Sequence, residues 1–312
     1  HDYLAMTDER FDYYHRVEER LKFDLNYFNR ITKGGLPPKT LNVALAGTGV
    51  GKSLFMCHLA SSVIAQGKNV LYITLEMAEE RIAERIDANL MNVTMDDLHT
   101  LPKKMFENYL TKIQKKTNGK LIVKEYPTAS AHVGHFRHVL QELNIKKDFQ
   151  PDIIFVDYLN ICASARMRAN SSVNSYTMVK SIAEEMRGLA VEFKLPIVTA
   201  TQTNRQGFTS TDVGLEDTSE SFGLPATADL MVALISTEEL EELDQIMVKQ
   251  LKNRYNDPTY FRRFIIGVDR ARMKLYDCEQ SATEELHDSG PAFDKSESGQ
   301  RISGEKTDGW DI

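Results

Sequence analysis

The stretch "AGTGVGKS", residues 46–53, decides the fold. It follows the apolar run "TLNVAL" and opens a helical pattern that continues from Leu54 to Gln66. Its one departure from the phosphate-binding loop GxxxxGK[ST] is Ala46 at the first glycine position. Small residues let backbone N–H groups close around phosphates, and the N-terminus of the following helix adds its positive dipole. The sequence therefore predicts an ATP site built from the whole stretch: Ala46, Gly47, Thr48, Gly49, Val50, Gly51, Lys52 and Ser53.

Apolar runs and helical patterns alternate from about residue 40 to residue 278. The strand-like runs are "TLNVALA", "NVLYIT", "KLIV", "DIIFVDYL" and "PIVTAT". Helical patterns fill the gaps at residues 54–66, 79–91, 131–144 and 177–194. This alternation is typical of βαβ units, so we predict an α/β fold with a mainly parallel central sheet. After residue 228 strands and turns take over, which predicts an antiparallel extension at one edge.

Polar side chains stand where the predicted strands end, and parallel sheets bind ligands at that edge. Lys52 is expected to reach the β- and γ-phosphates, and Ser53 to ligate Mg²⁺. Asp157 ends "DIIFVD" and is expected to hold the same ion through water. Glu76 follows "NVLYIT", where a carboxylate can polarise the attacking water, and Gln202 is a candidate sensor of the γ-phosphate. For Asp157 and Glu76, the alternative is a cap on the helix that follows.

The composition fits one large domain with additional segments. The chain has 312 residues, 42% of them hydrophobic, and no apolar run approaches the roughly 18 residues of a membrane span. Its three cysteines are widely spaced and form no metal-ligand pattern, which favours a reducing, cytoplasmic compartment. Nine acidic and three basic residues in 279–312 contribute −6 to the net charge of −7. The remainder is nearly neutral, so the acidic total does not exclude a local nucleic-acid site.

The basic stretch "KQLKNRYNDP", residues 249–258, lies about two hundred residues after the phosphate loop. The apolar runs "LDQIMV" and "TYFRRFIIGV" flank it. The pattern predicts two strands joined by a turn, with Lys249, Lys252 and Arg254 close to its tip. Nothing nearby in the sequence gives these basic side chains a chemical purpose.

Together these motifs resemble the helicase domain of DnaB-like replicative helicases, which has a RecA-like P-loop NTPase core. The likeness covers roughly residues 24–278 and is greatest to the T-even phage type. Five stretches match family motifs in the family's order: "LAGTGVGKS", "TLEMAEERIAER", "IIFVDYLN", "ATQTNR" and "LKNRYNDP". Five ordered motifs are far more specific than the phosphate loop alone. The resemblance implies ATP and Mg²⁺ as cofactors and a hexameric ring that moves 5′ to 3′ on single-stranded DNA and unwinds duplex. It also implies a primase and a helicase loader as partners, and the host cytoplasm as location if the protein is phage-encoded.

The resemblance assigns roles to residues at matching positions. Glu76 falls on the family's catalytic base, and Arg85, nine residues later, falls on an active-site arginine. Asp157 falls on the magnesium aspartate and Gln202 on the γ-phosphate sensor.

The same comparison gives the basic stretch a purpose. Lys252 and Arg254 fall on the Lys-x-Arg pair that reaches into the ATP site of the adjacent subunit. Arg254 is the better candidate for transition-state contact, because its planar fork suits phosphate oxygens. Lys249 matches no family position, and we expect a solvated strand residue.

One stretch departs from the family pattern. The DNA-binding loop of the family usually reads "LRESGSIEQDAD", whereas "TSESFGLPATAD" stands here, with Ser219 at the arginine position of bacterial relatives. Backbone N–H groups or other basic side chains are then needed for DNA phosphates. The candidates are Arg166, Arg168, Arg205, Ser219, Glu220, Ser221, Phe222 and Gly223, and for each arginine the alternative is a solvated loop charge.

The two ends of the chain differ from the core in composition. Residues 1–25 carry a thin apolar stripe on a charged helix, which is either a linker helix that docks on a neighbouring subunit or a surface helix of the same domain. Residues 26–278 form the predicted ATPase domain. Residues 279–312 are rich in serine, glycine and acidic residues and are expected to be disordered, with Trp310 as a candidate docking residue.

Two other functions remain open from the sequence. A RecA-type recombinase or clamp would use ATP to assemble on DNA without unwinding it. A small-molecule kinase would use the same phosphate loop, but the sequence has no evident arginine-rich lid or acceptor pocket.

Overall fold

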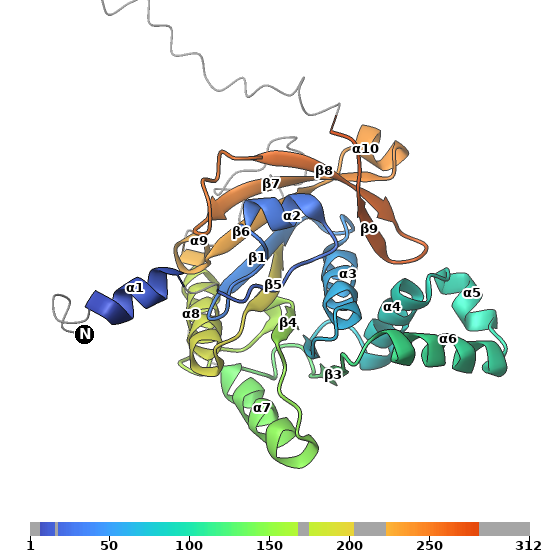
Figure 1. The fold of residues 1–312 in the computed structure, drawn as a ribbon, viewed down its shortest axis with the longest axis horizontal. Helices are drawn as coiled ribbons and strands as arrows, with labels where there is room; N and C mark the ends of the chain where they lie inside the picture. Colours follow the sequence, from blue (N-terminus) through green and yellow to red (C-terminus); the bar gives the residue numbers. More distant parts are fainter. Residues whose placement is uncertain (1–6, 16–17, 168–174, 203–222, 281–312) are drawn as a thin grey trace, which may run out of the picture. The chain divides into compact units, whose positions relative to one another are not determined.

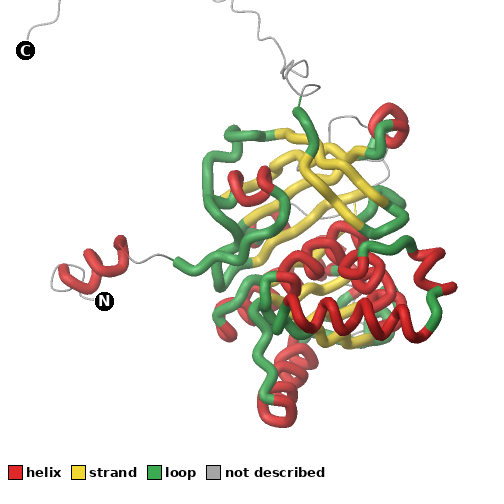
Figure 2. Tube along the Cα trace, turned by 45° about the vertical axis from the view of Figure 1, so that its right-hand side comes forward, coloured by secondary structure: helices red, strands yellow, loops and turns green. Residues whose placement is uncertain are grey.

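A computed structural model describes residues 7–15, 18–167, 175–202 and 223–280 (Figure 1). Nine strands form one sheet in the order β3-β2-β4-β5-β1-β6-β7-β8-β9, and Figure 2 shows these strands in yellow. The strands are β1 (Leu41–Ala46), β2 (Val70–Thr74), β3 (Leu121–Glu125), β4 (Ile153–Asp157), β5 (Ile197–Gln202), β6 (Leu230–Ile235), β7 (Gln245–Asn253), β8 (Arg263–Asp269) and β9 (Lys274–Asp277). Strands β1 to β6 pair in parallel, and β7, β8 and β9 continue the sheet in antiparallel pairs. The predicted fold class is confirmed.

Helices cover both faces of the sheet (Figure 1). They are α1 (Thr7–His15), α2 (Asn26–Ile31), α3 (Lys52–Ala65), α4 (Glu79–Met91), α5 (Met95–Thr100), α6 (Lys103–Lys116), α7 (Val133–Lys147), α8 (Ser175–Phe193), α9 (Gly223–Thr227) and α10 (Glu238–Glu242), with a short 3₁₀ turn at Leu159–Ile161. Helices α3, α4, α7 and α8 match the four helical patterns of the sequence.

The central strand β1 shows why its sequence is apolar throughout. Leu41, Val43 and Leu45 pack with α7 and α8, whereas Ala44 and Ala46 pack with α2 and α3 on the other face. All six residues of β1 are buried, as expected for a parallel strand covered on both faces. The buried strand β1 therefore holds the start of the phosphate loop in a fixed position.

The basic stretch differs from its prediction in one respect. Strand β7 continues to Asn253, so Lys249 and Lys252 lie in the strand and not at the tip of a turn. Lys249 is only 5% exposed, so the expectation of a solvated residue is wrong. Lys249 pairs with Ala233 of β6 and Arg263 of β8, so it lies on an interior strand of the sheet and not in a solvated turn.

The N-terminal region has less helix than the charged pattern indicates. Helix α1 ends at His15, and Leu21 forms an isolated antiparallel bridge with Leu36. Phe23 and Leu25 are buried in the core beside α2 and α3. No helix in the described part of the chain is long and apolar enough to cross a membrane.

Candidate functional site

The phosphate loop lies at the carboxyl end of β1. Gly49 and Gly51 have φ angles of 82° and 121°, which glycine adopts without a steric penalty. Helix α3 begins at Lys52, directly after the loop. Ala46 is fully buried at the end of the strand, where a side chain larger than a methyl group meets the packed core. The loop therefore joins the end of β1 to a helix N-terminus, in the strand–loop–helix order that the sequence predicts.

A cavity of about 300 Å³ opens beside this loop. It brings together side chains from separate segments of the chain. They are Thr48, Gly49, Gly51, Lys52, Ser53 and Leu54 from the loop and α3, Glu76 after β2, Arg85 on α4, Gln202 at the end of β5, and Arg270 and Met273 after β8. Glu76, Arg85 and Gln202 thus meet the phosphate loop, although all three lie far from Lys52 in the sequence.

Lys52 has a buried ammonium group with no hydrogen-bond partner among the described residues. Its Nζ lies 3.7 Å from the centre of the Tyr158 ring. Burial lowers the pKa of Lys52, and the Glu76 and Asp157 carboxylates oppose that change. A buried cation without a hydrogen-bond acceptor is suited to an anionic ligand such as a phosphate.

Asp157 is fully buried at the end of β4. Its Oδ2 accepts a 3.0 Å hydrogen bond from Tyr72, while its Oδ1 has no partner among the residues that the structure describes. Burial raises the pKa of Asp157, and the hydroxyls of Ser53 and Tyr72 and the charges of Lys52 and Arg85 act against it. Carboxylate and hydroxyl oxygens are hard donors, so Ser53 and Asp157 fit Mg²⁺.

Arg270 lines the cavity but was missed by the sequence analysis. It lies in the turn between β8 and β9, and its Nη1 is 4.0 Å from where a Cβ on Gly51 would stand. The only signal in the sequence is a cluster of basic residues in "VDRARMK". Its position depends on the antiparallel extension folding back over α3.

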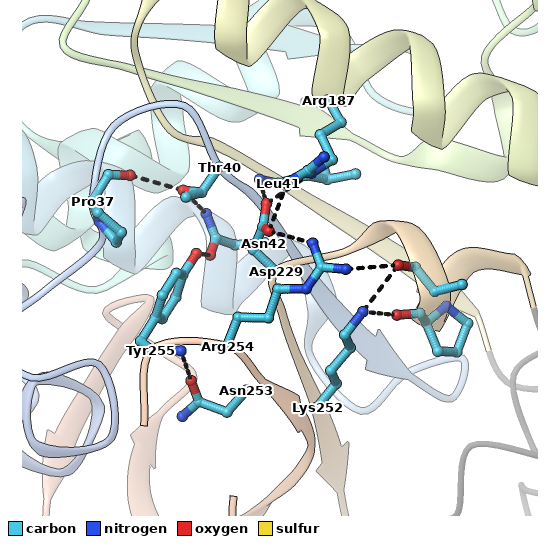
Figure 3. Close-up of polar contacts among 12 residues, drawn as sticks. Pro37, Thr40, Leu41, Asn42, Arg187, Asp229, Lys252, Asn253, Arg254 and Tyr255 are labelled. Carbon is cyan, nitrogen blue, oxygen red and sulfur yellow. Dashed lines mark hydrogen bonds and ion pairs between the residues drawn. The ribbon is translucent and has the colours of Figure 1, made fainter. Parts of the chain in front are cut away.

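Lys252 and Arg254 lie at the opposite edge of the sheet (Figure 3). Arg254 Nη1 donates to Asp229 Oδ1 at 2.9 Å, and Arg254 Nη2 donates to the carbonyl of Ala226 on α9 at 3.2 Å. Lys252 Nζ donates to the carbonyls of Pro225 and Ala226. Both basic side chains are therefore held against α9 and the start of β6.

These residues do not reach the ATP cavity of their own chain. Asp229, which bonds Arg254, also accepts from the backbone N–H of Leu41 at the start of β1, at 3.0 Å. The phosphate loop begins at the other end of β1, beyond Ala46. Six residues of parallel strand span roughly 17 Å at about 3.3 Å per residue. Lys252 and Arg254 are therefore separated from the phosphate loop of their own chain by the length of β1.

The predicted DNA contacts lie mostly outside the described residues. Arg168, Arg205, Ser219, Glu220, Ser221 and Phe222 all do so, and Gly223 is the first residue of α9. Arg166 is exposed and forms a 2.8 Å ion pair with Glu184 on α8. The predicted acidic tail after residue 280 also lies outside the described part.

A protein-family model, described as the DnaB-like helicase C-terminal domain, matches residues 21–270. The DnaB-like replicative helicase of Enterobacteria phage T4 is 46% identical over 287 residues, which are 91% of this chain and 60% of that protein. The replicative DNA helicase DnaB of Helicobacter pylori, strain 26695, is 25% identical over 67% of this chain and 41% of its own length. The chain thus spans about half the length of these relatives.

Two solved structures have the same fold. A DnaB-like replicative helicase, described with its interactions with primase, superposes with a TM-score of 0.72 at 16% identity, over 89% of this chain and 68% of that one. A second solved structure, of an isolated ATPase domain, superposes with a TM-score of 0.71 at 17% identity, over 88% of this chain and 97% of that one.

Proposed function

The chain belongs to the family of the DnaB-like helicase C-terminal domain, and on that premise we propose that it is the ATP-hydrolysing motor of a replicative DNA helicase. The observation that carries the proposal is that two buried atoms beside the phosphate loop, Lys52 Nζ and Asp157 Oδ1, have no hydrogen-bond partner among the described residues. A cation for phosphate and a carboxylate oxygen for magnesium are what ATP hydrolysis requires. The match to the helicase family favours this function over a recombinase or a kinase.

In the proposed reaction, the loop backbone binds the phosphates and Lys52 stabilises the charge that develops on them. Glu76 accepts a proton from the attacking water, which it orients by hydrogen bonding. Gln202 contacts the γ-phosphate, and Arg85 adds positive charge from α4. Ser53 and, through water, Asp157 would hold Mg²⁺, which neutralises phosphate charge when bound.

The site is completed by a second chain. Lys252 and Arg254 of one subunit contact the γ-phosphate in the cavity of the next, because they lie about one strand length from their own loop. Repetition of this contact gives the proposed hexameric ring, which moves 5′ to 3′ on single-stranded DNA and unwinds duplex. Hydrolysis then depends on assembly.

DNA is proposed to bind through phosphates near Arg166, Arg168, Arg205 and residues 219–223. Contacts to phosphates without contacts to base edges suit an enzyme that must pass over any sequence. Residues 1–25 are proposed as the linker region, 26–278 as the ATPase domain and 279–312 as a disordered tail. A primase, with which the matched replicative helicase is described as interacting, and a helicase loader are proposed partners.

Strand displacement on a forked substrate tests the proposal. We expect unwinding that needs ATP, Mg²⁺ and a 5′ single-stranded tail, and that fails on a fork with only a 3′ tail. DNA-stimulated ATP hydrolysis with filament formation but no unwinding would instead favour a recombinase or clamp. Transfer of phosphate to a small acceptor would rule out both.

A further inference from the structure

Asp229 is a carboxylate outside the ATP cavity whose side-chain bonds tie the basic pair to the start of β1. Its side chain is 6% exposed. Oδ1 accepts from Arg254 Nη1 at 2.9 Å and from Arg187 Nη2 at 3.2 Å, and Oδ2 accepts from Arg187 Nε at 3.2 Å and from the Leu41 N–H at 3.0 Å. Figure 3 shows Arg187 and Arg254 converging on it. The two arginines and the start of β1 therefore fix the orientation of this carboxylate.

The backbone of Asp229 ties the same elements together. Its N–H donates to Leu41 O at 2.8 Å, and its carbonyl accepts from the Arg254 N–H at 2.9 Å. Arg254 is thus held by Asp229 through both main chain and side chain. Few rotamers of the Arg254 side chain can keep the bonds to Asp229 and Ala226 together.

The charges of this cluster do not balance. Burial raises the pKa of Asp229, but the hydrogen bonds from Arg187, the Leu41 N–H and Arg254 outweigh burial, so the pKa is lowered and the group is ionised at neutral pH. One carboxylate thus faces the cations of Arg187, Lys252 and Arg254. The excess of positive charge leaves attraction available for an incoming phosphate.

Arg254 remains accessible while it is held. Its side chain is 45% exposed, and it borders a hollow of about 490 Å³ that Arg187, Ala226 and Glu184 also line. The Glu184 carboxylate is paired with Arg166 at 2.8 Å, which offsets its charge. The bonds to Asp229 and Ala226 engage only two of the five N–H donors of a guanidinium. The remaining donors are available to oxygens that enter from the hollow.

We propose that Asp229 is a positioning residue for Arg254: its carboxylate, oriented by the Arg187 fork, holds the Arg254 guanidinium in the geometry in which its free N–H groups meet the phosphates of a neighbouring subunit. This inference rests on the proposed function, and it assigns to Asp229 itself no contact with ATP. A group that orients a contacting group commonly matters for rate without touching the reactants.

The first experiment is a double-mutant cycle on the full chain, assembled with single-stranded DNA. Asp229→Asn keeps the size of the side chain and, through its amide oxygen, an acceptor for the Leu41 N–H, but it removes the charge that holds Arg254 and turns an amide N–H toward it. We expect kcat for ATP hydrolysis to fall about 10- to 100-fold, the usual range for a lost orienting contact, with KM nearly unchanged and a modest fall in melting temperature. In an Arg254→Ala background, Asp229→Asn should have no further effect.

A matched control is Glu192→Gln. Glu192 lies on α8, as Arg187 does, and receives a two-pronged contact from Arg137, at 2.9 Å and 2.8 Å, away from the basic pair. Its hydrolysis rate should equal that of the wild type. If Asp229→Asn does not fold, Arg187→Gln tests the same link, because it removes the fork that orients the carboxylate; it should lower the rate far more in the wild-type background than in the Arg254→Ala background.

Mixed rings separate positioning from a structural role. Asp229→Asn subunits retain a normal cavity but provide a poor arginine to the next subunit. They should therefore regain activity when mixed with Glu76→Gln subunits and gain none with Arg254→Ala subunits. Recovery with Arg254→Ala subunits but not with Glu76→Gln subunits would overturn this inference and leave the shared site in place. Losses that add in the double-mutant cycle would do the same. An Arg254→Ala variant with a normal hydrolysis rate would overturn the shared site itself, and this inference with it.

Discussion

The two edges of the central sheet carry different sets of charged side chains, which we propose are the two halves of one reaction site. At the carboxyl edge, β1 leads into a phosphate loop, and the side chains around the 300 Å³ cavity surround a space for a ligand of the same chain. At the amino edge, Lys252 and Arg254 have the charge needed for phosphate but, among the described residues, donate to Asp229 and the carbonyls of α9. The carboxyl edge thus surrounds a cavity within one chain, whereas the proposed role of the amino edge needs the phosphates of a second chain.

The largest effect should come from the carboxyl edge. Lys52→Ala removes the buried cation beside the phosphates, and we expect steady-state phosphate release to fall below detection. Lys112→Ala, a substitution on α6, which has no buried residue, serves as the control and should leave the rate unchanged. Measurable hydrolysis by Lys52→Ala would mean that the cavity beside the loop is not where the reaction occurs.

Arg254→Ala tests the amino edge. We expect hydrolysis to fall roughly 10³-fold or more, the scale of arginine fingers, while affinity for a fluorescent ATP analogue stays close to normal. The hydrolysis rate of Arg254→Lys should lie between those of the wild type and Arg254→Ala, because lysine keeps the charge but loses the planar fork. Mixing Arg254→Ala with Glu76→Gln subunits should restore part of the rate; no recovery at any ratio would count against a site shared between chains.

Glu76→Gln tests the proposed general base at the carboxyl edge. The amide cannot accept a proton from water, so we expect hydrolysis to fall about 10²- to 10⁴-fold with ATP binding retained. Rapid-quench measurement of a single turnover separates the chemical step from product release. Glu79→Gln, an exposed change in the first turn of α4, is the control. A near-normal single-turnover rate for Glu76→Gln would remove the assigned base.

The smallest effect concerns Arg270, which the antiparallel extension brings to the carboxyl edge. Loss of a hydrogen bond to a charged group costs about 1.5–3 kcal/mol, so Arg270→Ala should weaken ATP binding at least tenfold. Arg272→Ala is the control, because Arg272 forms an ion pair with Asp269 and does not line the cavity. Equal affinities for the two variants in equilibrium binding would show that Arg270 only borders the site.

The carboxyl edge was predictable from the sequence for a physical reason. A phosphate loop requires small residues, Lys52 and Ser53 at fixed spacing, and parallel strands bring Glu76, Asp157 and Gln202 to the same edge. Both features can be recognised from short stretches of sequence: the spacing within the loop, and a polar residue directly after an apolar run. The roles of the individual residues remain predictions until the variants are measured.

Features that depend on distant packing were not predictable in the same way. Arg270 reaches the cavity only because β9 packs against α3, and Asp229 meets Arg254 only after β6 and β7 pair. Lys249 is buried although a charged side chain usually indicates exposure. Helix α6 was missed although Phe106, Tyr109, Leu110 and Ile113 recur at helical spacing; the structure leaves these side chains half-buried.

The separation of the two edges by β1 has a consequence for stoichiometry. The proposed donor and acceptor surfaces differ, so head-to-tail association places the arginine of each subunit in the cavity of the next, and repetition of that contact can close a ring. An open chain of subunits then has one complete site fewer than it has members, whereas closure adds the missing site. Specific activity per subunit should therefore rise with protein concentration and become constant once the assembly closes.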